Sequence, residues 1–137
     1  MTSRQRPVFP ALDPADYIGL ADELATRHEQ AAKRTAADRA YYAAFLISRE
    51  QLTVKGYILP HYDSQDHEYV TETLKRRDLL GTYGNQEFRL RKARNHVTYD
   101  IRDLTYSQGH PSLKWMTDTA KEIIKRVLKL PTCSPEK

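Results

Sequence analysis

The sequence predicts an all-α protein, a compact bundle of about five helices. Three observations support this prediction. Apolar residues recur at three- and four-residue steps through most of the chain, which is the period of an amphipathic helix. No segment shows the alternation, or the Val, Ile and Thr enrichment, that is typical of β-strands. Short stretches with Gly, Pro and Ser separate the helical segments, and none of them is a glycine-rich phosphate loop.

Length and composition indicate a single domain. The 137 residues suffice for one hydrophobic core. We expect a flexible N-terminal tail over residues 1–12, a helical domain over 13–130 and a flexible C-terminal tail over 131–137. The net charge of +4 permits a nucleic-acid partner without requiring one. Without an apolar run of about 18 residues or a secretory signal, we expect a cytoplasmic protein with no membrane segment.

Apolar stripes predict the first two helices. Asp13 is a favoured N-cap and Pro14 fits the first helical position, so a helix should begin here. Its stripe comprises Tyr17, Leu20, Ala21 and Leu24. The polar stretch 31–38 either continues this helix or forms a tight turn. A second helix follows and should end at Gly56; its stripe comprises Tyr41, Ala44, Phe45, Ser48 and Leu52.

Two further helices follow a loop at residues 57–65. Asp66 should open the third helix, and the turn-rich segment that starts at Gly81 should end it. Asn85 should cap the fourth helix, which we expect to end after Ile101 because the next residues have loop chemistry.

The last helix has the most regular apolar stripe. Ser112 or Pro111 should begin it, and Pro131 should close it. The stripe comprises Leu113, Met116, Ala120, Ile123, Ile124 and Val127. This pattern predicts that one face of the helix is buried along its whole length.

Residues 89–100, RLRKARNHVTYD, combine a helical stripe with dense polar chemistry. The apolar members should share one narrow face that points to the core: Leu90, Ala93, Val97 and Ile101. Charged and polar side chains cover the other faces. The segment is therefore either the solvated basic face of an ordinary helix or an active site built on one.

His96 is the residue that favours an active site. A histidine can accept and donate protons near neutral pH, and nearby arginines can hold a phosphate and stabilise its pentacovalent transition state. The ribose 2′-hydroxyl can act as internal nucleophile, so RNA cleavage needs neither a metal nor a protein nucleophile. The other histidines show no metal-ligand spacing, and we predict no metal site and no cofactor.

Two motifs of the chain resemble the HEPN superfamily, named after domains of higher eukaryotes and prokaryotes that often have nucleotide-binding partners. The first motif is DRAYYAAFLISREQL, residues 38–52. The second is an arginine–asparagine helix that ends in tyrosine–aspartate, residues 94–100. The resemblance covers residues 13–130 and implies a HEPN-like helical bundle.

The resemblance also implies a metal-independent endoribonuclease of toxin–antitoxin or antiviral-defence type. The family signature is an arginine, four to six residues and a histidine, with a polar residue directly after the arginine. Two arginines satisfy this spacing with His96, namely Arg91 and Arg89. Counting instead from Arg94, which a polar residue follows, places Tyr99 at the histidine position. A branch of the superfamily has this tyrosine ending, and RNHVTYD is similar to it.

The resemblance implies roles for polar residues in and just before the second motif. His96 would act in acid–base chemistry. Arg91 and Arg94 would hold the scissile phosphate, and Asn95 would orient either that phosphate or the motif of the second subunit. Two further side chains would support them, with a hydroxyl contact from Tyr99 and the positioning of an arginine by Asp100. Further cations would extend the RNA-binding surface: Arg89, Lys92, Arg76 and Arg77.

Members of the family dimerise so that two copies of the motif face one cleft, so we expect a homodimer that acts on RNA. A neutralising partner is also expected, either an antitoxin or a small nucleotidyltransferase. The alternative is a non-catalytic HEPN module that binds RNA or docks a protein, which the tyrosine at position 99 favours. A third interpretation is a helical bundle of unrelated function.

Overall fold

The computed structural model describes residues 8–102, 104 and 111–134. Across these residues the secondary structure is helical, without a strand, and comprises α1 (Asp16–Ala25), α2 (Gln30–Val54), α3 (Gln65–Arg76), the short 3-10 helix η1 (Gly81–Tyr83), α4 (Gly84–Tyr99) and α5 (Leu113–Leu128). None of the described helices has the length and apolar character needed to cross a membrane. The predicted all-α bundle of five helices is confirmed.

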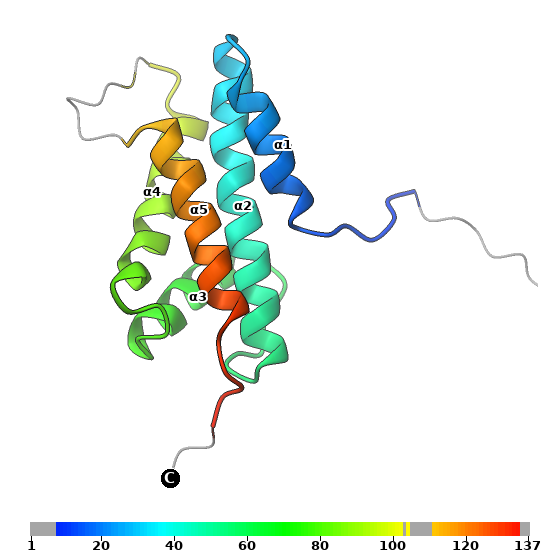
Figure 1. The fold of residues 1–137 in the computed structure, drawn as a ribbon, viewed down its shortest axis with the longest axis vertical. Coiled ribbons are helices and arrows are strands. Elements are labelled where there is room, and N and C mark those ends of the chain that lie inside the picture. The colour runs from blue at the N-terminus through cyan, green and yellow to red at the C-terminus, as the bar shows by residue number, and fades with distance from the viewer. Residues whose placement is uncertain (1–7, 103, 105–110, 135–137) are drawn as a thin grey trace, which may run out of the picture.

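Helix α2 is the central element, because it packs against each of the other α-helices. In Figure 1 it runs through the middle of the bundle, with α1 on one side and α4 and α5 on the other. Its most extensive contacts are with α1 and α5. Small side chains permit such close approach, and α2 buries many of them: Ala36, Ala37, Ala40, Ala43 and Ala44 are at most 1% exposed.

The polar stretch 31–38 belongs to α2. The chain turns before it, between Ala25 and Gln30, where the N–H groups of Thr26 and Arg27 each donate a hydrogen bond of 3.2 Å to a carbonyl near the end of α1. Buried alanines within the stretch pack it onto the core, so it continues the following helix and not the preceding one.

The predicted stripes of α2 and α5 form much of the core. All the stripe residues of α2 are buried, and so are Met116, Ala120, Ile123 and Val127 of α5. Two predicted helix boundaries are also confirmed. Gly56 follows α2 with a left-handed φ of 86°, and the Ser112 hydroxyl caps α5 by accepting a hydrogen bond of 3.0 Å from the N–H of Trp115.

Other helix ends differ from the predictions because local turns precede or follow them. Helix α1 begins later than predicted, since the Asp13 carboxylate accepts a hydrogen bond of 3.0 Å from the N–H of Ala15 and forms a separate turn. Helix α3 ends at Arg76, and the chain then reverses through Asp78, whose φ is 50°. Helix α4 starts at Gly84, one residue before the predicted cap.

Two residues that were predicted to lie in the core are exposed. Helix α4 ends at Tyr99, so Ile101 lies beyond it and is 93% exposed. Leu20 of α1 is 40% exposed, while Ile18 packs against the core instead. Both predictions were wrong because the helix end and the rotation of α1 depend on packing partners that are distant in sequence.

The first described residues extend away from the bundle, whereas the residues after α5 contact it. Residues 8–12 run away from the bundle (Figure 1). After α5, the carbonyl of Pro131 accepts a hydrogen bond of 2.8 Å from the Tyr57 hydroxyl, and the N–H of Cys133 donates one of 2.7 Å to the carbonyl of Lys55. The first residues of the segment expected to form a flexible C-terminal tail are therefore attached to the end of α2.

Glu87 is a fully buried carboxylic acid at the contact of α3 and α4. Its Oε2 accepts a hydrogen bond of 2.6 Å from the Thr71 hydroxyl, whereas its Oε1 is buried without a hydrogen bond from the described residues. Burial raises the pKa of Glu87 to about 7, although the Thr71 hydrogen bond and the charge of Arg91 oppose this shift.

This buried acid predicts a pH-dependent stability. Between its ordinary pKa of 4.5 and about 7, Glu87 holds a proton in the folded protein but not in the unfolded chain. The stabilisation that protonated Glu87 gives to the folded protein is therefore fully present below the ordinary pKa. It is lost as the pH rises towards the raised pKa. We expect the free energy of unfolding of the wild type, relative to Glu87→Gln, to fall by about 1 to 3 kcal/mol between pH 5 and pH 8.

Urea denaturation at both pH values measures this difference. Comparison with the variant matters because His67, whose pKa is lowered to about 4, changes stability in the opposite direction over part of the range. Glu68→Gln removes the same charge from an exposed position of α3 and should leave the pH dependence unchanged. A Glu87→Gln profile parallel to that of the wild type would contradict the prediction.

Candidate functional site

The predicted site residues of α4 point to different sides of the helix. Arg91 and His96 are five positions apart, which places them about 140° apart around a helix axis. Arg91 and Arg94 are partly buried on the side that faces α2 and α3, whereas His96 is exposed. One subunit therefore does not bring Arg91 or Arg94 to His96. By contrast, Arg89, seven residues before His96, lies on the same face of α4 as that histidine.

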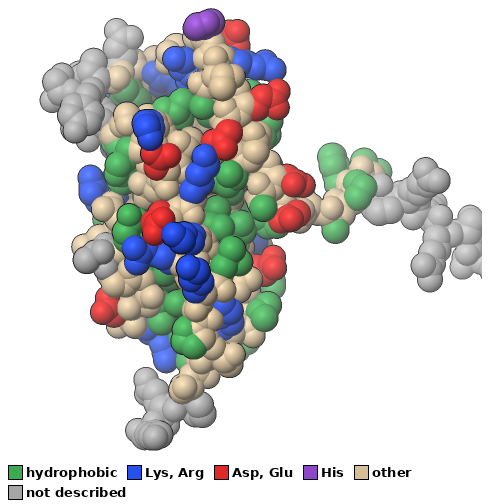
Figure 2. Space-filling view, viewed as in Figure 1, with side chains coloured by type: hydrophobic (Ala, Val, Ile, Leu, Met, Phe, Trp, Pro, Cys, Tyr) green, Lys and Arg blue, Asp and Glu red, His purple; other side chains and the backbone are tan. Residues whose placement is uncertain are grey.

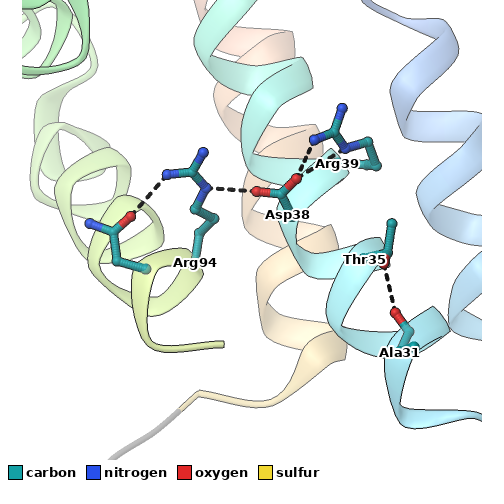
Figure 3. Close-up of polar contacts among 6 residues, drawn as sticks. Ala31, Thr35, Asp38, Arg39 and Arg94 are labelled. Carbon is teal, nitrogen blue, oxygen red and sulfur yellow. Dashed lines mark hydrogen bonds and ion pairs between the residues drawn. The ribbon is translucent and has the colours of Figure 1, made fainter. Parts of the chain in front are cut away.

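Arg94 joins α4 to α2 (Figure 3). Its Nε donates a hydrogen bond of 2.7 Å to Asp38, and its Nη1 donates one of 2.9 Å to the side-chain oxygen of Asn95. The guanidinium also lies 5.1 Å from the ring centre of Tyr41 and 4.9 Å from that of Tyr42. With a side chain only 11% exposed, Arg94 joins α4 to α2, and its contact with a scissile phosphate stays a prediction.

Asp38, which sequence reasoning did not assign to the site, connects two arginines. Besides Arg94 it binds Arg39, its neighbour on α2, through the other carboxylate oxygen (Figure 3). Arg39 in turn lies 5.0 Å from the ring centre of Tyr42, whose ring is thus flanked by two guanidinium groups. The signal in the sequence was the acidic first residue of DRAYYAAF, one helical turn before Tyr42.

An open depression of about 570 Å³ lies at the C-terminal end of α4, and its walls are formed by Asn95, His96, Tyr99, Asp100, Ile101 and Arg102. This volume falls within the usual range of small-molecule sites. Tyr99 is 73% exposed, so its hydroxyl is accessible to a ligand. Three of the predicted catalytic residues, Asn95, His96 and Tyr99, are therefore brought together here.

Asp100 positions an arginine that sequence reasoning did not name. Its carboxylate accepts hydrogen bonds of 2.9 Å and 2.7 Å from the guanidinium of Arg102 and one of 3.0 Å from the Arg102 N–H. The side-chain hydrogen bond from Arg102, with smaller help from the nearby His96, holds the pKa of Asp100 well below its usual range. Asp100 is therefore an anion that fixes Arg102 at the edge of the depression.

Arg34 of α2 holds the backbone beneath this depression. Its guanidinium donates hydrogen bonds to the carbonyls of Val97 (3.2 Å), Asp100 and Arg102 (2.8 Å). The last carbonyls of a helix lack partners within the helix and carry partial negative charge, so a cation there is doubly favourable. Arg34 therefore anchors the end of α4 to the start of α2, where no sequence motif had indicated it.

The other predicted RNA-binding cations are spread along the α4 region. Arg89 is exposed, donates a hydrogen bond of 3.1 Å to Gln86 and lies over the ring of Trp115. Lys92 is also exposed and lies 5.5 Å from the ring centre of Phe88. Both side chains are therefore accessible to solvent, and their contact with RNA stays a prediction.

Arg76 and Arg77 lie far from the depression. They end α3, which connects through η1 to the first residue of α4, Gly84. His96 follows Gly84 by twelve residues, a rise of about 18 Å along a helix. Arg76 also forms an exposed ion pair of 3.7 Å with Glu72. The structure thus does not bring these two arginines to His96.

A different histidine, His67 of α3, lies beside the motif arginines. Its ring stacks on Phe45 with ring centres 3.9 Å apart, and its Nδ1 is 2.5 Å from the Tyr41 hydroxyl. Burial, followed by the charges of Arg94, Arg91 and Arg49, lowers the pKa of His67 to about 4. His67 is therefore neutral at pH 7, and sequence spacing alone could not show that it meets arginines of α4.

Asp66 connects α3, the helix that carries His67, to α2. Its carboxylate is fully buried and accepts hydrogen bonds from the N–H groups of His61 (2.9 Å) and Tyr62 (2.8 Å) and from Arg49 of α2 (3.1 Å). A buried carboxylate with three donors is well satisfied. The acid predicted only as a helix start is thus a structural anchor for α3.

The Arg34 contacts generate a testable prediction. Arg34→Ala should leave the carbonyls at the end of α4 without their cation and should speed hydrogen exchange of the Tyr99 and Asp100 amides by roughly tenfold, the scale of one or two hydrogen bonds to a charged group. Lys33→Ala, the neighbouring change on α2, is the matched control. Unchanged hydrogen exchange at both amides in Arg34→Ala would show that the hydrogen bonds from Arg34 do not stabilise the end of α4.

Among the described residues, no group of three or more His, Cys, Asp or Glu side chains could hold a metal ion. Comparisons with protein-family models, curated proteins and solved structures found no match for this chain. The resemblance to HEPN domains therefore depends on the two sequence motifs.

Proposed function

We propose that the chain is an endoribonuclease of the HEPN type, a cytoplasmic toxin–antitoxin or antiviral-defence protein that cleaves RNA without a metal. The observation that supports this proposal best is that His96, Asn95, Tyr99 and Arg102 line one open depression. These side chains supply a proton-transfer group, neutral hydrogen-bond donors and a cation. RNA cleavage by internal attack uses groups of these three kinds.

In the proposed reaction the ribose 2′-hydroxyl attacks the adjacent phosphorus while His96 takes the hydroxyl proton. The bond from phosphorus to the 5′-oxygen then breaks, that oxygen takes a proton from solvent water, and the His96 imidazolium returns its proton to solvent. The products are a 2′,3′-cyclic phosphate and a 5′-hydroxyl end. Arg102, held by Asp100, stabilises the charge on the phosphate, and the side chains of Asn95 and Tyr99 donate hydrogen bonds to its oxygens.

The depression is open on one side, which favours completion by a second copy of the chain. Tyr99 and Ile101 on its wall are 73% and 93% exposed. Adjacent exposed apolar side chains beside a polar site are typical of protein contacts, and a two-fold contact would place two His96 side chains at one cleft.

Light scattering tests the proposed homodimer. We expect a mass of about 32 kDa at micromolar concentration, twice the 15.9 kDa of one chain. Ile101→Asp should shift the protein towards one chain's mass, because an ionised side chain is costly to bury at an interface. A mass of 15.9 kDa for the wild type would contradict a shared cleft.

Cleavage assays test the proposed chemistry. We expect activity to persist in excess EDTA, products to carry 2′,3′-cyclic phosphates, and 2′-deoxyribose at the scissile position to prevent cutting. His96→Ala should lower the rate by roughly a hundredfold or more, the scale of one acid–base group. His61→Ala, an exposed histidine in the loop between α2 and α3, is the matched control. Intact RNA after incubation with the purified wild-type dimer would contradict the nuclease proposal.

A second candidate function is a non-catalytic module that binds RNA or docks a protein. The observation that favours it is the engagement of Arg94 with Asp38, on a side of α4 that does not face His96. This candidate predicts binding that weakens with salt, since basic side chains displace counterions from phosphates, without cleavage. Either function is compatible with the expected neutralising antitoxin or nucleotidyltransferase.

A further inference from the structure

Arg91 is half-buried on α4, yet within the described part of the chain it forms no hydrogen bond and no ion pair. Its guanidinium lies 5.5 Å from the ring centre of Phe88, on its own helix. An arginine that is partly removed from water is usually paired with a carboxylate or another acceptor. No carboxylate among the described residues therefore forms an ion pair with Arg91.

The neighbouring acidic side chains do not fully supply a negative charge to pair with Arg91. Asp38 is bound by Arg94 and Arg39, and Asp66 is bound by Arg49. Glu87, one turn before Arg91, is fully buried and hydrogen-bonded to Thr71, and its raised pKa of about 7 leaves it only partly ionised at neutral pH. The junction of α2, α3 and α4 thus holds more arginines than ionised carboxylates.

His67 completes the set of donors at this junction. Burial raises the pKa of the Tyr41 hydroxyl, which stays protonated and lies 2.5 Å from Nδ1 of His67. In the tautomer in which this hydroxyl donates to Nδ1, the imidazole proton is on Nε2, which can then donate to a ligand. Both His67 and Arg91 are partly exposed, so both side chains are in contact with solvent on this face.

The surface formed by α1, α2 and α5 provides a contrast. Figure 2 shows its lysine and arginine side chains interspersed with acidic ones. Lys114 pairs with Asp118 at 2.6 Å, and Lys121 pairs with Asp22 at 3.0 Å. These two lysines are each paired with an acid, whereas Arg91 is not paired with one among the described residues.

We propose that Arg91, with His67 and the charge of Arg94, forms a phosphate-binding site on the side of α4 that faces α2 and α3. A guanidinium can bind two phosphate oxygens at once, and the imidazole N–H can donate to a third. The phosphate belongs either to an RNA backbone or to a free nucleotide or inorganic phosphate. The site does not require cleavage at the His96 depression.

NMR spectroscopy of the labelled imidazole of His67 tests the site with inorganic phosphate as probe. We expect saturable shifts of the His67 resonances and a rise of the His67 pKa, because a nearby anion favours the imidazolium form. Arg91→Gln should weaken phosphate binding by roughly ten- to a hundredfold, the scale of a charged hydrogen-bonding group. Arg27→Gln removes the same charge from an exposed position after α1 and should have little effect.

Two further probes distinguish the sources of the phosphate. A 2′-O-methyl oligoribonucleotide, which lacks the attacking hydroxyl, should shift the same His67 resonances if the site takes an RNA backbone. If a nucleoside monophosphate shifts them and the oligonucleotide does not, the site takes a free nucleotide. Either result supports a phosphate site.

The proposal is overturned if phosphate leaves the His67 resonances unchanged, if it shifts only those of His96, or if Arg91→Gln and Arg27→Gln weaken binding equally. Should Arg91→Gln fail to fold, Arg91→Lys retains the charge without the two-pronged geometry and should bind phosphate more weakly than the wild type. The nuclease proposal is tested separately, by the loss of cleavage in His96→Ala, so either proposal can fail without the other.

Discussion

The ion pair between Asp38 and Arg94 determines the arrangement of everything that α4 carries. Its partners are separated by 56 residues, and their side chains are 14% and 11% exposed. A pair this sheltered from water is weakly screened by salt, and removing one member would leave a charge without its partner at a cost of several kcal/mol. Because the pair sets the rotation of α4 against α2, it decides which residues of α4 face inward and which remain accessible.

That rotation divides the polar residues of α4 into two groups. One group, with Arg91 and Arg94, meets Tyr41 and His67 at the junction of α2, α3 and α4. The other, with His96 and Tyr99, opens to solvent at the depression. Residues that are close together in the sequence motif thus belong to two separate sites. Side chains five positions apart point in directions about 140° apart around the helix axis.

Helix α2 supplies the anchors for both groups from one side. Arg34 holds the backbone at the end of α4, Asp38 holds its middle, and Arg49 holds α3 through Asp66. These positions are four and eleven residues apart, which is the spacing of one helical face. The same helix also packs closely in the core through its buried alanines. One helix therefore both fills the core and orients the polar chemistry.

Local chemistry in the sequence determined the secondary structure, the stripes of α2 and α5, the cap at Ser112 and the stop at Gly56, since each depends on residues within a few positions of one another. It also singled out α4 as the helix richest in polar chemistry. Only the tertiary structure decided that Ile101 is exposed, that Arg34 and Asp38 belong to the site, and that the arginines of α4 meet His67 in place of His96. Those outcomes depend on where helices end and how they rotate against one another, and contacts between residues dozens of positions apart determine both.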